Sequence, residues 1–164
     1  MIKITKNTIG KALLNFKSII TGIELNKSVA NVAMGDIIKH FRNEQDPDGK
    51  KWPALAEVTK ERRRHGKGSA SPKMLQDTGQ MLQSINISQT TASAAVVSLN
   101  KYDALFGINV AQLQNDGGKG KILEADGSVT EINVPAREFM GISDLGKREI
   151  EALAPIVAKK VAVK

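Results

Sequence analysis

An arginine close to a phenylalanine stands out in the stretch VPAREFMGIS, residues 134–143, as a side chain that could do chemistry. Arg137 carries a permanent charge and a planar fork of donors that fits a carboxylate or a phosphate. Between Pro135 and Phe139, at an expected strand-to-helix corner, it suits a bidentate contact better than catalysis. Because a buried arginine without a partner is costly, we predict that Arg137 pairs with an acidic group or a backbone carbonyl, within the subunit or across an interface.

Other polar residues do not combine into a recognisable site. Asp46 and Asp48 resemble the start of a calcium loop, but the further oxygen ligands are out of register, so we expect a turn. The segment NDGGKGKI lacks the spacing of a phosphate-binding loop. His40 and His65 could act as bases, yet no nucleophile motif accompanies them. The sequence therefore predicts no catalytic residue, no cofactor, no metal site and no small-molecule substrate.

Positive charge concentrates in EVTKERRRHGKGSASPK, where glycine, serine and proline also predict a flexible loop over about residues 60–73. Such a run is usually a solvated surface. It can also contact DNA phosphates, without sequence preference and in a salt-dependent way. Both interpretations stay open, and the residues considered for DNA contact are Arg62, Arg63, Arg64 and Lys67.

The composition bounds the class of protein. The 164 residues are 41% hydrophobic and 25% charged, as expected for one globular domain over residues 1–164. No apolar run suits a membrane helix and the N-terminus does not resemble a secretory signal, so we expect an intracellular protein without membrane contact. Cysteine is absent, which excludes disulfides and thiolate zinc sites. The net charge of +7 favours nucleic acid or an acidic partner without specifying either.

Apolar residues at helical spacing predict two N-terminal helices after a short strand in MIKIT. A break at Thr21 and Gly22, where glycine is costly within a helix, separates the first helix from a second over about residues 24–42. At the other end of the chain, Ser143 is the expected N-cap of a terminal helix that Pro155 should kink or shorten. The apolar stripe of the first helix consists of Ile9, Leu13, Phe16, Ile20 and Ile23.

Turn residues between β-branched runs predict two hairpins. One covers residues 85–99, and the other covers about 121–134 with Asp126 and Gly127 at its turn. Residues 102–113 between them are expected to form a helix. The expected fold is therefore α+β, with N-terminal helices, an antiparallel β-sheet with a protruding hairpin, and a C-terminal helix.

The corner after the second hairpin is expected to be a rigid link. Pro135 ends the hydrogen bonding of the last strand, Phe139 and Met140 anchor the chain in the core, and Gly141 permits the turn. Trp52 is expected to cover the core where the chain leaves the second helix.

Three ordered motifs resemble one known family. RNEQDPDGKKWPALAEVTKER resembles its segment in which a helix meets a Pro-Asp-Gly turn, then a tryptophan, a leucine and a threonine. LQDTGQMLQSI is similar to its Leu, Asp-Thr-Gly, Leu, Ser-Ile pattern, and VPAREFMGIS resembles its closing Pro-Ala-Arg, Phe, Leu-Gly signature. The family is the virion morphogenesis, or tail completion, proteins of Mu-like and related contractile-tailed phages. Its motif residues here are Trp52, Leu75, Thr78, Gly79, Pro135, Arg137, Phe139 and Gly141.

The resemblance implies a structural, non-enzymatic protein of the head-tail junction, which completes the tail or joins it to the neck during virion assembly. It implies a homo-oligomeric ring through which the genome passes, with phage neck and tail proteins as partners. The location is then the virion, after assembly in the host cytoplasm, for an infecting phage or a prophage. The hairpin over residues 122–134 is expected to reach toward a neighbour or the tail. The alternative is a basic DNA-binding accessory protein.

Overall fold

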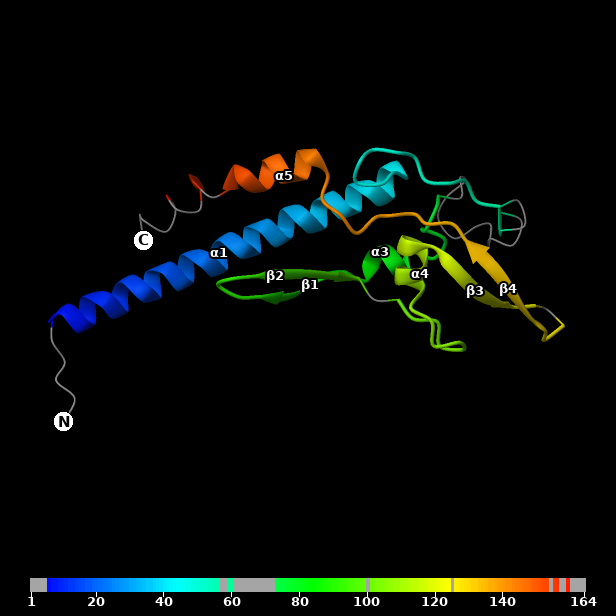
Figure 1. The fold of residues 1–164 in the computed structure, drawn as a ribbon, viewed down its shortest axis with the longest axis horizontal. Helices are drawn as coiled ribbons and strands as arrows, with labels where there is room; N and C mark the ends of the chain where they lie inside the picture. Colours follow the sequence, from blue (N-terminus) through cyan, green and yellow to red (C-terminus); the bar gives the residue numbers. More distant parts are fainter. Residues whose placement is uncertain are drawn as a thin grey trace.

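Helices and two-stranded ribbons make up the protein, and the α+β class is confirmed (Figure 1). The computed structural model describes residues 6–56, 59–60, 73–99, 101–124, 126–153, 155–156 and 159, with side chains from residue 22 onward. The expected strand in MIKIT therefore lies outside the described residues. The elements are α1 (Lys6–Asn43), α3 (Gln80–Gln83), β1 (Ile85–Thr90), β2 (Ala95–Leu99), α4 (Val110–Asp116), β3 (Gly118–Leu123), β4 (Val129–Val134) and α5 (Asp144–Glu151).

The described strands pair as two separate antiparallel ribbons. β1 pairs with β2 and β3 pairs with β4, and both hairpins lie where the sequence predicts them. An irregularity between Ile87 and Gln89 interrupts the first ribbon, whereas the second runs in unbroken register from Gly118 opposite Val134 to Leu123 opposite Val129. The second hairpin thus begins slightly before residue 121.

A single helix, α1, replaces the two N-terminal helices, so the predicted break at Gly22 is wrong. Glycine is required there by packing rather than by a turn. A β-carbon on Gly22 would lie 2.6 Å from the carbonyl oxygen of Ala92, in the turn between β1 and β2. The missing side chain lets that turn approach the helix. The helix expected over residues 24–42 is the second half of α1.

The helix predicted over residues 102–113 is shorter and begins later, at Val110. Two polar side chains explain the difference. The Asp103 carboxylate accepts hydrogen bonds from the backbone of Leu105 and Phe106, which closes a turn, and the Asn109 side chain accepts one from Gln112. Asn109 is therefore the N-cap of α4.

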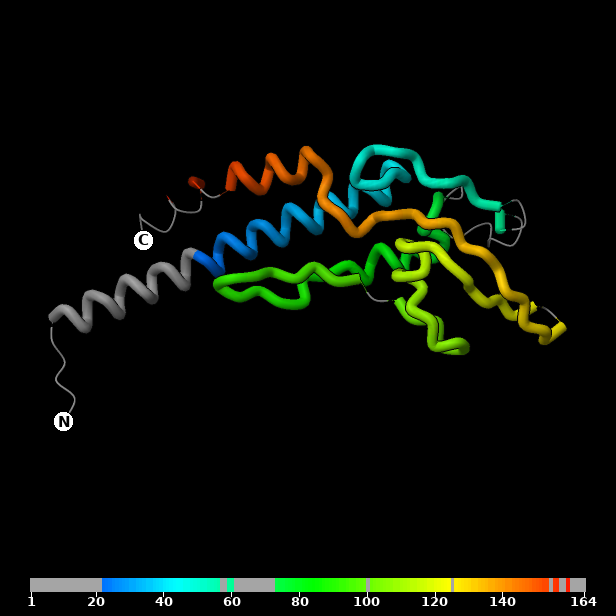
Figure 2. Tube along the Cα trace, viewed as in Figure 1, coloured from blue at the N-terminus to red at the C-terminus, as the bar shows by residue number. Residues whose placement is uncertain are grey.

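The core lies around the second half of α1. The β1–β2 ribbon and α5 pack against this helix, on opposite sides of it in Figure 1, while the β3–β4 hairpin projects away. Residues 135–143 run from β4 past the C-terminal end of α1 to α5, as the orange tube in Figure 2 shows. The buried apolar cluster consists of Ile37, Phe41, Trp52, Leu75, Ile85, Leu99, Ala111 and Phe139.

Candidate functional site

Three aromatic rings form the centre of the site. Phe41, Trp52 and Phe139 pack with ring centroids 4.8 to 6.4 Å apart, and all three side chains are buried. The indole nitrogen of Trp52 donates a hydrogen bond to the carbonyl of Glu138 at 2.9 Å. The predicted position of Trp52 over the core is confirmed, and its polar edge holds the corner segment, residues 135–143, in place.

Arg137 is 4% exposed, and its guanidinium donates hydrogen bonds to backbone carbonyls and to a side-chain amide of the same chain. Nε donates to the carbonyl of Pro53 at 3.1 Å, Nη2 to that of Ala54 at 3.3 Å, and Nη1 to the side chain of Gln114 at 3.2 Å. The backbone N–H of Arg137 also donates to the carbonyl of Gln114. The predicted pairing with a backbone carbonyl is confirmed, and it lies within the subunit. Arg137 thereby joins the chain after Trp52 to α4.

Asn115, the next residue of α4, fixes the corner from the same side. Its side-chain oxygen accepts hydrogen bonds from the backbone of both Phe139 and Met140 at 2.9 Å. The Phe139 ring is fully buried, as expected, but Met140 is 41% exposed. The expectation that both residues anchor the corner is therefore wrong for Met140, because the chain bends there: the backbone N–H of Gly141 donates to the carbonyl of Phe139, and the Met140 side chain is left exposed.

Two buried polar residues on α1 hold the corner from the other side. His40 Nδ1 donates to the carbonyl of Phe139 at 3.0 Å. The carboxylate of Asp36 accepts hydrogen bonds from the backbone and the hydroxyl of Ser143, at 2.7 and 2.8 Å. The same hydroxyl accepts from the backbone of Gly146, so the predicted N-cap of α5 is confirmed. His40 Nε2 lies 3.7 Å from Asp36 and has no hydrogen-bond partner among the described residues.

Glycine at position 141 is explained by a close approach. Gly141 is not among the residues with positive φ, and a β-carbon there would lie 2.5 Å from the ring of Pro47. Pro47 belongs to the turn that follows α1, in which Asp46 accepts a hydrogen bond from the backbone of Lys50. The predicted turn at DPDG is thus confirmed, and it packs directly on the corner.

The loop before α3 docks on the end of α1. Glu44 accepts a hydrogen bond from the backbone of Met74 at 2.7 Å, and the side chain of Gln76 donates to the carbonyl of Phe41. Leu75, between them, is buried with a φ of +59°, which is rare for a large side chain. Gly79 has a φ of +71°, so this motif glycine does serve a left-handed backbone.

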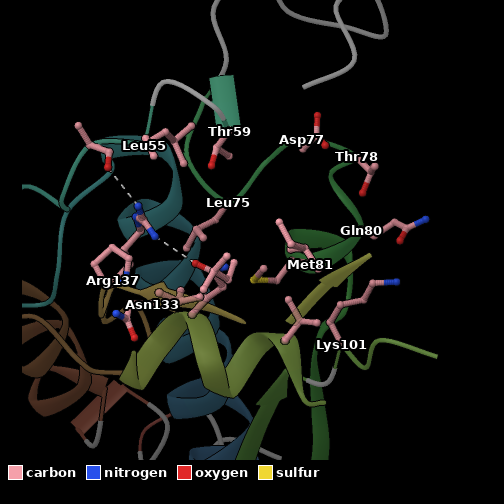
Figure 3. Close-up of a pocket in the computed structure, with 18 of the residues that line it drawn as sticks. Leu55, Thr59, Leu75, Asp77, Thr78, Gln80, Met81, Lys101, Asn133 and Arg137 are labelled. Atoms are coloured by element: carbon pink, nitrogen blue, oxygen red, sulfur yellow. Dashed lines mark hydrogen bonds between the residues drawn. The ribbon is translucent and has the colours of Figure 1, made fainter. Parts of the chain in front are cut away.

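A pocket of about 880 Å³ opens between this loop, the chain after Trp52, α4 and the β3–β4 hairpin (Figure 3). Its lining is largely apolar, with Leu55, Leu75 and Met81 on one side and Ile122 and Ile132 from the hairpin. Arg137 lies in one wall. Charged lining residues of both signs include Lys101 and Asp77.

The motif residues named from the sequence thus converge in part. Trp52, Phe139, Arg137 and Gly141 belong to the corner and its contacts, and Leu75, Thr78, Pro135 and Arg137 line the pocket. Gly79 shapes the loop between these two groups. The residues considered for DNA contact, Arg62, Arg63, Arg64 and Lys67, lie outside the described residues.

The sequence did not indicate which polar residues hold the corner, and it suggested His40 only as a possible base. Asp36 and His40 are one turn apart on α1, and two polar residues on a face that also carries Ile37 and Phe41 are a detectable sign of a buried pair. Gln114 and Asn115 offered no comparable sign, because their partners are 23 to 25 residues away in the chain.

Two further properties concern only the part of the chain that the structure describes. Within it, no group of three or more histidine, cysteine, aspartate or glutamate residues is placed to hold a metal ion. The described helices include none that is both long and apolar enough to span a membrane.

Comparison with known proteins adds one match. The model of the phage virion morphogenesis family matches residues 11–156, which include the corner, the pocket and both hairpins. No curated protein and no solved structure matches.

Proposed function

Because this chain belongs to the phage virion morphogenesis family, we propose that it is a structural protein of the head-tail junction, which completes the tail or joins it to the neck. The family match over residues 11–156 carries the proposal, since it covers nearly all of the described fold. A role in building the phage particle follows from the family itself. The assignment to the head-tail junction is more specific than this general role, and it is the part that we propose.

The geometry of the corner supports a structural role rather than catalysis. The side chains that could do chemistry there, Arg137, His40 and Asp36, are buried and hydrogen-bonded to other groups of the same chain. These bonds hold the aromatic centre, the pocket wall and α5 in one arrangement. A particle component needs such a fixed scaffold, because its contacts must repeat identically in each copy.

The same proposal includes a homo-oligomeric ring and contacts with neck and tail proteins, in the virion and in the host cytoplasm during assembly. A ring needs two different surfaces on each subunit. The projecting β3–β4 hairpin and the pocket beside it are candidate surfaces of this kind.

Loss of the gene in the phage or prophage tests the proposal. Electron microscopy of the lysate should then show filled heads and finished tails that are not joined, and no infectious particles. Adding the purified protein to that lysate should restore joined particles and infectivity. Complete, infectious particles in the absence of the gene would refute the proposal, and a lysate without finished tails would move the role to an earlier step.

The alternative of a DNA-binding accessory protein stays a prediction, because its residues Arg62, Arg63, Arg64 and Lys67 lie outside the described part of the chain. Binding to duplex DNA should weaken steeply as salt rises, and reversing these charges should abolish it. No binding at low salt would eliminate this function.

A further inference from the structure

The β3–β4 hairpin has two apolar faces. In its register Leu123 lies opposite Val129, and these side chains are 54% and 53% exposed. The next pair, Ile122 opposite Thr130, points to the other face because side chains alternate along a strand, and both residues line the pocket. One face therefore presents an apolar pair at the tip, here called the knob (Leu123 and Val129), and the other face forms a pocket wall.

The pocket has room for such a pair. Its volume of about 880 Å³ lies within the range of roughly 300 to 1,000 Å³ typical of pockets that bury a small ligand. Leu55, Leu75 and Met81 supply apolar surface opposite the hairpin wall. Exposed paired leucine and valine side chains at a projecting tip are unfavourable in water, so burying them in an apolar pocket is favourable.

Charged residues of both signs accompany both apolar surfaces. On the knob face Lys121 lies opposite Glu131, and Asp126 lies at the exposed end of the hairpin. The pocket lining contains the carboxylates of Asp77 and Glu124 as well as Lys101 and Arg137. Neither surface carries a large excess of one sign, so charge does not oppose a contact between them.

We propose that the knob of one copy docks in the pocket of a second copy of this chain. The knob and the pocket wall are opposite faces of the same hairpin, so a copy that fills its neighbour's pocket still offers its own pocket to the next. Such a head-to-tail contact builds a ring if its rotation closes. This inference rests on the proposed function, which calls for a ring, and it names the two surfaces that join.

Two single variants test the contact by sedimentation velocity of the full chain. Leu123→Glu removes the knob and leaves the pocket intact, whereas Thr78→Arg obstructs the pocket and leaves the knob intact; both residues are exposed. Each variant alone should lose self-association and stay monomeric. Mixed together they should form a 1:1 dimer and nothing larger, because only one productive knob and one productive pocket remain.

Matched controls are Val96→Glu, an exposed apolar residue on the other ribbon, and Gln83→Arg, an exposed residue of α3 that does not line the pocket. Both should associate like the wild type. Circular dichroism melting should give the same transition for all four variants, which separates lost association from lost folding. A two-fold, tip-to-tip contact would instead leave Thr78→Arg associating normally, and this would overturn the proposal.

A cross-linking experiment can detect the contact even when self-association is too weak for sedimentation velocity. The chain has no cysteine, so Leu123→Cys and Thr78→Cys introduce the only thiols. Oxidation of the mixed variants should give a disulfide-linked heterodimer, well above the level from either variant with Gln83→Cys. A wild-type chain that stays monomeric, together with no preferential cross-link, would refute the contact. Unjoined heads and tails after gene loss would still support the proposed function in that case, so the two failures are distinguishable.

Discussion

At the scale of single residues, Arg137 shows how a buried charge can be held by acceptors of the protein's own chain. Its three nitrogens donate to two carbonyls and one amide from segments that are 83, 84 and 23 residues away. Hydrogen bonds to a charged donor are stronger than neutral ones, and the acceptors would be left unsatisfied without it. The side chain is therefore a structural cross-link between Pro53, Ala54 and α4.

Replacing Arg137 with alanine should lower the free energy of unfolding by about 2 to 4 kcal/mol, because several buried acceptors lose their donor. Urea denaturation followed by circular dichroism measures this loss. Arg42→Ala, at an exposed site on α1, should change stability by less than about 0.5 kcal/mol. If Arg137→Ala unfolds at the wild-type urea concentration, the proposed cross-link is wrong.

Phe139 and Met140 are a second residue-scale comparison within one segment. Phe139→Ala should destabilise the protein by about 3 to 5 kcal/mol, since it empties the centre of the aromatic cluster. Met140→Ala should cost less than about 0.5 kcal/mol, because that side chain is exposed. Thermal and urea unfolding of the two variants should differ clearly; similar losses would contradict the observed orientation of the segment.

At the scale of elements, two glycines of α1 have opposite surroundings. A β-carbon at Gly22 would meet the Ala92 carbonyl at 2.6 Å, whereas one at Gly35 would meet nothing within 4 Å. Glycine is therefore needed for packing at position 22, whereas at position 35 it only lowers the stability of the helix. Helix propensity alone cannot distinguish the two.

Gly35→Ala should raise the stability by about 0.5 to 1 kcal/mol, through reduced freedom of the unfolded chain and better helix propensity. Gly22→Ala should lower it by about 1 to 3 kcal/mol, because the turn between β1 and β2 must move away. Melting temperatures of the two variants should shift in opposite directions. A stabilising Gly22→Ala would contradict the close contact of hairpin and helix.

The first turn of α5 carries an exposed ion pair with a defined pH dependence. A hydrogen bond from Lys147, and then its charge, lowers the pKa of Asp144 below its ordinary value of 3.8, and the same contact raises the pKa of Lys147 above 10.5. The contribution of Asp144 to stability is thus present above pH 3.8 and is lost as pH falls through its lower, folded pKa. That of Lys147 is present below pH 10.5 and is lost as pH rises through its higher, folded pKa.

Carboxyl NMR titration checks this pair. Lys147→Ala should return the pKa of Asp144 toward its ordinary value, and high salt should do the same in the wild type, because both groups are exposed. The effect on overall stability should be small. An Asp144 pKa that does not respond to the substitution would show that the ion pair is not formed in solution.

Much of the element pattern was predictable from the sequence, and the exceptions have local causes. Apolar periodicity and turn residues indicated the helical region, both hairpins and the Ser143 cap, because these depend on neighbours in the chain. The break at Gly22 was wrong because the contact with Ala92 is tertiary. The late start of α4 depends on side chains of Asp103 and Asn109, a turn signal that apolar spacing outweighed.

At the scale of the whole molecule, the corner joins parts that local patterns cannot relate. The motif comparison identified Arg137, Trp52 and Phe139, yet not which segments they hold together, since their partners lie far along the chain. The pocket was likewise unpredictable, because it requires four separate segments to be placed in space. The spacing of apolar residues along the chain carries no information on the distances between segments that are far apart in the sequence.

Hydrogen exchange of backbone N–H groups should be slow at the corner and fast at the exposed end of the β3–β4 hairpin. The backbone N–H groups of Arg137 and Phe139 should exchange slowly, at rates close to those of global unfolding, because they are bonded to α4 beside the buried core. Those of the exposed hairpin end, residues 126–129, should exchange much faster. Mass spectrometry of peptides from the two regions measures the contrast, and equal rates would indicate that the corner is not part of the stable core.

The long separations that the corner closes also set an order of events during synthesis. His40 meets the Phe139 carbonyl and Asp36 meets Ser143 across 99 and 107 residues of chain. At translation rates of about 5 to 20 residues per second, the end of α1 waits roughly 5 to 20 s for the segment that completes its core. Until the last quarter of the protein emerges, the end of α1 lacks the Phe139 ring that packs against Phe41 in the folded protein.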